Sequence, residues 1–121
     1  MTEIDAKTDA LVPAWLTLPE VAEQLGVEAT RVRQLVKEGQ LIAVRRGPDR
    51  TLQIPAAFLA EGRIVKGLVG TITLLKDDGF TDEEMLEWLF TEDESLPGTP
   101  CQALRENRGT EVKRRAQALA V

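Results

Sequence analysis

The residues of this sequence whose types and spacing suit a chemical task are the polar and cationic side chains of one short segment, residues 29–38. A helix over this segment would hold Val32, Leu35 and Val36 on one face. Its other faces would present Thr30, Arg31, Arg33, Gln34 and Lys37. Arginine can donate two hydrogen bonds to guanine, glutamine can pair with adenine, and lysine neutralises phosphates. The segment therefore predicts a recognition helix for the major groove of double-stranded DNA.

A second group of cations surrounds a turn further along the chain. Residues 47–49, Gly-Pro-Asp, are a dense turn signal, and the apolar patterns of residues 41–46 and 52–55 on either side predict a β-hairpin. The arginines around this turn are Arg45, Arg46 and Arg50. A hairpin with these side chains near its tip would act as a wing that reaches a neighbouring groove or the phosphate backbone.

The element that must position the recognition helix is a helix just before it. Thr17 and Glu20 have the spacing of a capping box, and Pro19 lies near the first helical position. Gly26 supplies the backbone freedom needed to leave this helix. The apolar residues at helical spacing between these signals are Leu18, Val21, Ala22 and Leu25. Two short helices joined by a tight turn predict a helix-turn-helix.

The rest of the chain predicts further helices. A short one is expected over residues 55–59, closed by Glu61 and Gly62, followed by helices over residues 65–76 and 100–106. Thr81 and Glu84 form another capping box, and Thr110 is expected to cap the last helix. The fold class is mainly α with a small β-hairpin wing. The expected organisation is a flexible N-terminal tail (1–13), a winged helix-turn-helix domain (14–62) and a C-terminal helical domain (63–121).

The charge of the chain is polarised along its length. The net charge is −5, which opposes binding to phosphates when it is taken alone. However, residues 28–66 hold eight Lys or Arg against four Asp or Glu, whereas residues 77–94 hold nine Asp or Glu and no Lys or Arg. The cations are thus concentrated on the predicted recognition helix and wing. We expect the acidic helices after Lys76 to face away from DNA.

The composition excludes several classes of protein. The chain has one cysteine, Cys101, and no histidine, so an internal disulfide and the usual zinc or haem sites are not expected. Without a paired nucleophile or a phosphate-binding glycine loop, enzymatic activity is not expected either. The N-terminus lacks a signal peptide and no stretch is apolar enough to span a membrane. The sequence predicts a cytoplasmic, nucleoid-associated protein without a cofactor.

These motifs together carry a family resemblance. The residues concerned are Thr17-Leu18-Pro19-Glu20-Val21-Ala22, Leu25-Gly26-Val27, residues 31–41 and Arg45-Arg46-Gly47. The region from about Leu16 to Leu59 resembles the MerR and excisionase type of winged helix-turn-helix. With its helical tail, the whole chain resembles a small actinobacterial family of winged-helix DNA-binding proteins that carry their own C-terminal helical domain. The resemblance implies DNA binding through the second helix and the wing, and a role as a transcriptional regulator. Metal or drug sensing is not implied, because the long coiled coil and effector domain of MerR regulators are absent from the sequence.

Several further interpretations stay open at this level. The acidic C-terminal helices could instead serve a protein-interaction adaptor or antitoxin-like module, or form a homodimer contact. The three consecutive apolar residues Trp88, Leu89 and Phe90 cannot all face inward on one helix, so one of them is expected at an interface. Thr2 and Thr8 in the expected tail would be accessible to a Ser/Thr kinase, and phosphorylation of Thr8 would add negative charge near the DNA-binding module.

Overall fold

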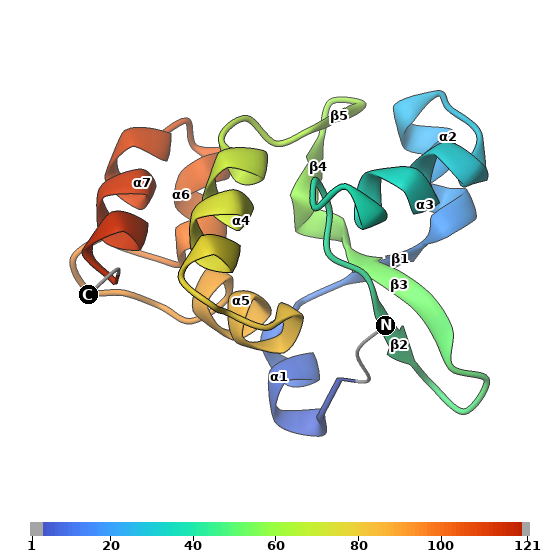
Figure 1. Ribbon diagram of the computed structural model, residues 1–121, viewed down its shortest axis with the longest axis horizontal. Coiled ribbons are helices and arrows are strands. Elements are labelled where there is room, and N and C mark those ends of the chain that lie inside the picture. Colours follow the sequence, from blue (N-terminus) through green and yellow to red (C-terminus); the bar gives the residue numbers. More distant parts are fainter. Residues whose placement is uncertain (1–3, 120–121) are drawn as a thin grey trace.

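The structure, a computed structural model, describes residues 4–119 and has two halves that lie side by side (Figure 1). The first half contains α1 (Ala6–Leu11), β1 (Trp15–Thr17), α2 (Leu18–Leu25), α3 (Ala29–Lys37), β2 (Val44–Arg46), β3 (Thr51–Pro55), a single 3-10 turn (Ala56–Phe58), β4 (Leu59–Ala60) and β5 (Arg63–Ile64). The second contains α4 (Leu68–Asp77), α5 (Asp82–Leu89), α6 (Pro100–Arg105) and α7 (Gly109–Ala118). The mainly α fold with a small wing is confirmed. No helix in the described part of the chain has the length and apolar character needed to cross a membrane.

The helix-turn-helix forms as its local signals require. Thr17 and Glu20 make both hydrogen bonds of the capping box at the start of α2. The backbone N–H and the hydroxyl of Thr17 hold the pKa of Glu20 below its ordinary value, because hydrogen bonding with these two groups stabilises the charged carboxylate. Gly26 ends α2 with φ +69°, in the left-handed region that glycine tolerates best. This turn sends the chain directly into α3, which packs on α2.

The wing belongs to a sheet with one strand more than the sequence predicts. The strand order is β1-β3-β2, and both neighbours of β3 are antiparallel to it. Leu16 lies opposite Ile54 in this sheet, so it is a strand residue. β1 ties the start of the helix-turn-helix to the wing, which fixes their relative orientation.

The prediction of a helix over residues 55–59 is wrong beyond the first turn. Only Ala56–Phe58 forms a 3-10 turn, and the chain then enters the hairpin β4–β5. Glu61 and Gly62, expected to close a helix, are the two turn residues of this hairpin, with φ of +53° and +75°. Positive φ at both central residues matches the right-handed twist of the flanking strands.

The four C-terminal helices lie where the sequence predicts them, although α4 begins at Leu68 and not at the expected residue 65. Thr81 and Thr99 cap α5 and α6 through their side chains, as their positions in the sequence suggest. Thr110 is not a cap: α7 begins one residue earlier, and Arg108 occupies the N-cap position. Of the apolar run in α5, Leu89 and Phe90 are buried, whereas Trp88 is only half-buried.

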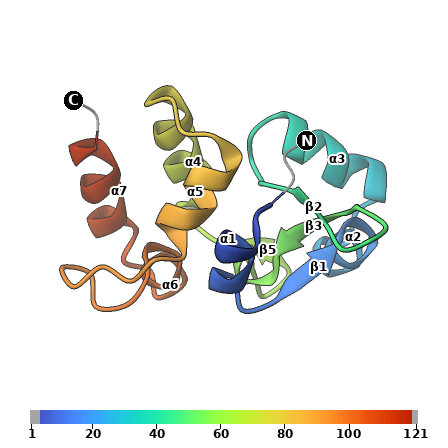
Figure 2. The same ribbon diagram turned by 90° about the horizontal axis from the view of Figure 1, so that it is seen from below.

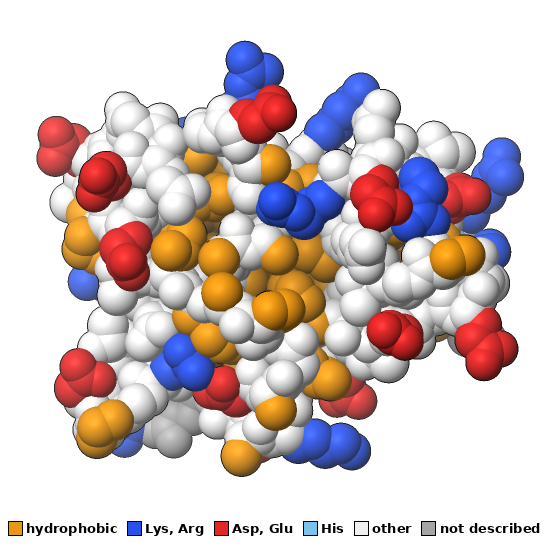
Figure 3. Space-filling view, turned by 180° about the vertical axis from the view of Figure 1, so that it is seen from behind, with side chains coloured by type: hydrophobic (Ala, Val, Ile, Leu, Met, Phe, Trp, Pro, Cys, Tyr) orange, Lys and Arg blue, Asp and Glu red, His pale blue; other side chains and the backbone are white. Residues whose placement is uncertain are grey.

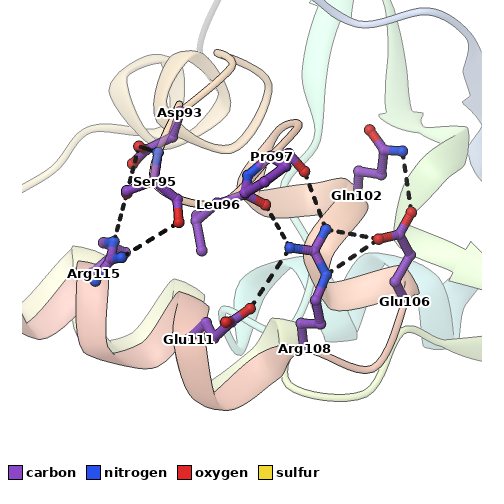
Figure 4. A network of polar contacts seen from close by, with 9 residues as sticks. All are labelled: Asp93, Ser95, Leu96, Pro97, Gln102, Glu106, Arg108, Glu111 and Arg115. Atoms are coloured by element: carbon purple, nitrogen blue, oxygen red, sulfur yellow. Dashed lines mark hydrogen bonds and ion pairs between the residues drawn. The ribbon is translucent and has the colours of Figure 1, made fainter.

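Arginines hold the loop between α5 and α6 against α7 (Figure 4). Arg108 donates to the backbone oxygens of Leu96 and Pro97 and forms ion pairs with Glu106 and Glu111. Arg115 donates to the hydroxyl of Ser95 at 2.8 Å. These C-terminal cations are therefore engaged within their own half of the molecule.

The two halves share one hydrophobic core. At their junction Phe58, at the end of the 3-10 turn, stacks on Phe90 with ring centroids 5.8 Å apart. Arg105 of α6 donates to the backbone oxygens of Ala57 and Leu59, at 3.0 and 2.6 Å. Cys101 is buried at the same place, and burial raises the pKa of its thiol to about 12. On the face opposite to the one seen in Figure 1, apolar side chains are exposed near the middle, and charged side chains lie mostly around them (Figure 3).

The prediction of a flexible N-terminal tail is wrong for the part of residues 1–13 that the structure describes, which starts at residue 4. Residues 6–11 form α1, which lies between the sheet and α5 (Figure 2). Thr8 is 2% exposed and contacts Glu83 of α5, so its expected accessibility to a kinase is also wrong in this conformation. Thr2 lies outside the described residues.

Arg46 of the wing holds α1 in place. Its guanidinium forms two hydrogen bonds with the carboxylate of Asp9, at 2.7 and 2.8 Å, and a third with Gln53 at 2.9 Å. It also lies 4.5 Å from the centre of the Trp15 ring. Two parallel bonds to one carboxylate fix both partners in orientation as well as distance.

The shared core predicts that the halves unfold together. Phe58→Ala should lower the free energy of unfolding by about 3–5 kcal/mol, because Phe58 is fully buried at the junction. Urea titrations in Trp15→Phe and Trp88→Phe backgrounds would follow the two halves separately. The midpoints should fall together. A midpoint that moves in one half alone would show that the core is not shared. Leu119→Ala, at an exposed position, is the control.

The contact between Arg46 and Asp9 predicts coupled losses of stability. Because both side chains are partly exposed, we expect Arg46→Ala and Asp9→Ala each to lower the free energy of unfolding by about 1 kcal/mol. The double variant should lose less than the sum of the two single losses. Additive losses in a double-mutant cycle would mean that the ion pair contributes nothing to the docking of α1.

Candidate nucleic-acid interface

The outer face of α3 carries all five residues predicted for base and phosphate contacts. Val32 and Leu35 are buried and anchor the helix in the core. The exposed residues are Thr30, Arg31, Arg33, Gln34 and Lys37. Arg31 forms an ion pair with Glu38 at 3.7 Å, with both side chains more than 40% exposed. Such an exposed pair is weak, so it leaves Arg31 available to another anion.

Two hollows adjoin α3, and one of them lies between α3 and the wing. One of about 540 Å³ lies on α3 and is lined by Thr30, Arg33, Gln34 and Lys37. The other, of about 250 Å³, lies between α3 and the wing and is lined by Leu18, Pro19, Arg33, Arg45, Arg50, Thr51 and Leu52. Arg33 lines both hollows. The structure thus brings together cations from α3 and the wing, which are separate in the sequence.

The wing turn has a defined backbone. Gly47 and Arg50, at its two ends, have φ of +78° and +55°. The guanidinium of Arg45 donates to the backbone oxygen of Arg50 at 3.0 Å and so spans the turn. Arg45 is half-buried and Arg50 is exposed. This contact braces the turn from within the hairpin.

Arg46 differs from Arg45 and Arg50 in where its side chain lies. Its guanidinium is occupied by Asp9, Gln53 and the ring of Trp15, and it does not line either hollow. The sequence predicts it as a DNA contact because it adjoins the turn. The alternation of side chains along β2 places it apart from Arg45. No local signal identifies its partner Asp9, which lies 37 residues earlier.

The acidic segment lies in the other half of the molecule. α5, which carries four of its nine carboxylates, packs on α1, α4 and α6. α1 contacts α5 and also, through Asp9, the wing strand β2. The basic surface of α3 and the wing is thus formed by the first half alone.

Comparisons with known proteins agree with this arrangement. Residues 3–59 match a family model described as "DNA-binding protein Rv2175c, wHTH domain", and residues 65–120 match "Rv2175c C-terminal domain of unknown function". The protein named DNA-binding protein Rv2175c, from Mycobacterium tuberculosis (strain ATCC 25618 / H37Rv), is 42% identical over 132 residues, which cover 97% of this chain and 89% of that protein. The NMR structure of Rv2175c superposes with a TM-score of 0.85 at 39% identity, over 100% of this chain and 90% of that one. The chain therefore belongs to the family of DNA-binding protein Rv2175c, in which a winged helix-turn-helix domain precedes a C-terminal helical domain.

Proposed function

We propose that the protein binds double-stranded DNA with α3 in the major groove and the wing on the adjacent backbone, and that it acts as a transcriptional regulator at the nucleoid. The name of its Mycobacterium tuberculosis relative supports DNA binding. The observation that carries the proposal is the position of Arg33, which lines both the hollow on α3 and the hollow beneath the wing.

The exposed side chains suggest separate roles. Thr30, Arg33 and Gln34 occupy the first two turns of α3, the part of a recognition helix that contacts base edges. Arg31 and Lys37 flank them and suit phosphates. Arg45 and Arg50 on the wing also suit phosphates, which position a protein without reading sequence. We assign Arg46 a positioning role, because its guanidinium is held by Asp9.

Arg33→Ala should weaken binding to the preferred duplex about 5-fold to 100-fold, the effect of losing one specific arginine contact. Fluorescence anisotropy with a labelled duplex chosen by selection from random DNA would measure the change. Arg114→Ala is the matched control, since Arg114 is exposed on α7 at the opposite end of the molecule (Figure 1). If Arg33→Ala and the wild type bound the duplex with equal affinity, α3 would not be part of the DNA interface.

The salt dependence of DNA binding should distinguish the roles of Arg45 and Arg46 in the wing. Arg45→Ala should reduce the slope of log K against log salt by about 1, because one phosphate contact is lost. Arg46→Gln should leave this slope unchanged even where it lowers stability, because Arg46 bonds to Asp9 and not to DNA in our assignment. A slope reduced equally in both variants would place Arg46 on the backbone of the duplex.

We further propose that two copies bind neighbouring half-sites. One recognition helix and one wing contact few base pairs, and regulators of this type gain specificity from paired half-sites about 34 Å apart. Sedimentation of the protein with the selected duplex should show two copies on each DNA molecule. A single copy at saturation would contradict this arrangement.

A second candidate function is that of a protein-interaction adaptor. The half-buried ring of Trp88 lies between hollows of about 360 and 300 Å³ that are also lined by acidic residues of α5 and the following loop. These carboxylates suit a cationic segment of a partner protein. Failure of the wild-type protein to shift any duplex at low salt would favour this function over DNA binding.

A further inference from the structure

A groove between α4 and α7 lies outside the DNA-binding surface. The two helices start at the same end of the C-terminal half and run side by side (Figure 1). They approach closely near their first turns, where an added Cβ on Gly67 would lie 3.9 Å from the Cα of Gly109. Further along, they enclose a cavity of about 520 Å³ that is open on one side. This volume is within the range of about 300–1,000 Å³ that is typical of small-molecule sites.

Most of the groove surface is apolar. Leu74 contributes its side chain, and two threonines already donate their hydroxyl hydrogens within α4. Thr71 donates to the backbone oxygen of Gly67 at 2.8 Å, and Thr73 donates to that of Val69 at 2.9 Å. A ligand in the groove would therefore meet methyl groups and glycine backbone along one wall.

The polar side chains that line the groove include two cations and no anion. They are the side chains of Lys66, Asn107, Thr110 and Lys113. Within residues 4–119, none of these four side chains has a hydrogen bond or an ion pair, and no Asp or Glu lines the groove. Two ammonium groups, an amide and a hydroxyl are all able to donate hydrogen bonds. An anionic group is the complement of this set.

The protein's own packing does not explain why residue 70 is a glycine, which leaves the groove empty. Gly70 lies in α4 and lines the cavity, and a Cβ added to it would have no atom within 4 Å. Its φ is not in the left-handed region, so its backbone does not require glycine. Glycine is a poor helix former. A larger residue would stabilise the helix, but its side chain would occupy the groove.

We propose that this groove binds a small organic anion with an apolar body, of which a medium-chain carboxylate is the simplest example. The apolar part lies along α4 against Leu74 and the threonine methyl groups. The carboxylate meets Lys66 and Lys113 at the rim. The backbone of DNA fits less well, because its phosphates are charged throughout and would leave the apolar wall without a partner.

Octanoate, 1-octanol and octylammonium test the proposal, because they share one apolar chain and differ in the head group. In two-dimensional amide NMR spectra of the full chain, octanoate should shift the signals of Gly67, Gly70 and Gly109 saturably. Lys66→Ala and Lys113→Ala should each weaken octanoate binding about fivefold and leave the weaker binding of octanol unchanged. Arg114→Ala, on α7 but outside the groove, should bind octanoate as the wild type does.

Gly70→Leu separates binding from folding. This variant should melt at a higher temperature than the wild type, because leucine is a better helix former. It should nevertheless lose the octanoate-induced shifts of Gly67 and Gly109. Shifts that persist in Gly70→Leu, or equal affinities for the three head groups, would overturn the proposal. It would also be overturned if a DNA duplex moved these glycine signals and octanoate did not.

Discussion

The contacts at the end of the wing strand determine how the two halves of the molecule are arranged. β3 continues into a single 3-10 turn, whose Phe58 is buried against Phe90. Arg105 then donates to two backbone oxygens of the same segment, those of Ala57 and Leu59. Because β3 also pairs with β1 and β2, a rigid junction here fixes the wing, and through β1 the start of α2. The spacing between α3 and the wing thus depends on packing that no DNA-facing residue supplies.

This arrangement explains how an acidic chain can present a basic surface. The net charge of −5 is a sum over a molecule whose charges are separated in space. The carboxylates of residues 77–94 lie on the C-terminal half, whereas Arg33, Arg45 and Arg50 meet on the first half. Exposed charges further apart than about 8–10 Å are largely screened at physiological salt. The local potential of the α3 and wing surface, rather than the net charge, therefore decides whether a phosphate backbone is attracted.

The sequence predicts the elements that depend on neighbouring residues and misses those that depend on distant ones. The capping boxes at Thr17 and Thr81 and the turn at Gly26 are local arrangements of a few residues, so their pattern is sufficient. β1 has three residues and exists only because β3 pairs with it. α1 has six residues, too few for an apolar period, and the ion pair that Asp9 forms with the wing contributes to its docking. The hairpin β4–β5 had a local signal in Glu61-Gly62, but a helix end explains that pair equally well.

The same limit applies to the candidate site. Residue type and helical spacing place the five polar side chains of α3 on the surface, and the structure agrees with that placement. The same reasoning assigns Arg46 to DNA, because charge near a turn is all that the sequence shows. The planar guanidinium of arginine binds carboxylates and backbone oxygens through several donors at once, and Arg46, Arg105 and Arg108 are all used in this way inside the molecule. The lysines of the α4–α7 groove have no such partners among the described residues. The number of arginines in a segment is therefore a poor measure of its DNA-binding surface until the arginines that bind within the protein have been identified.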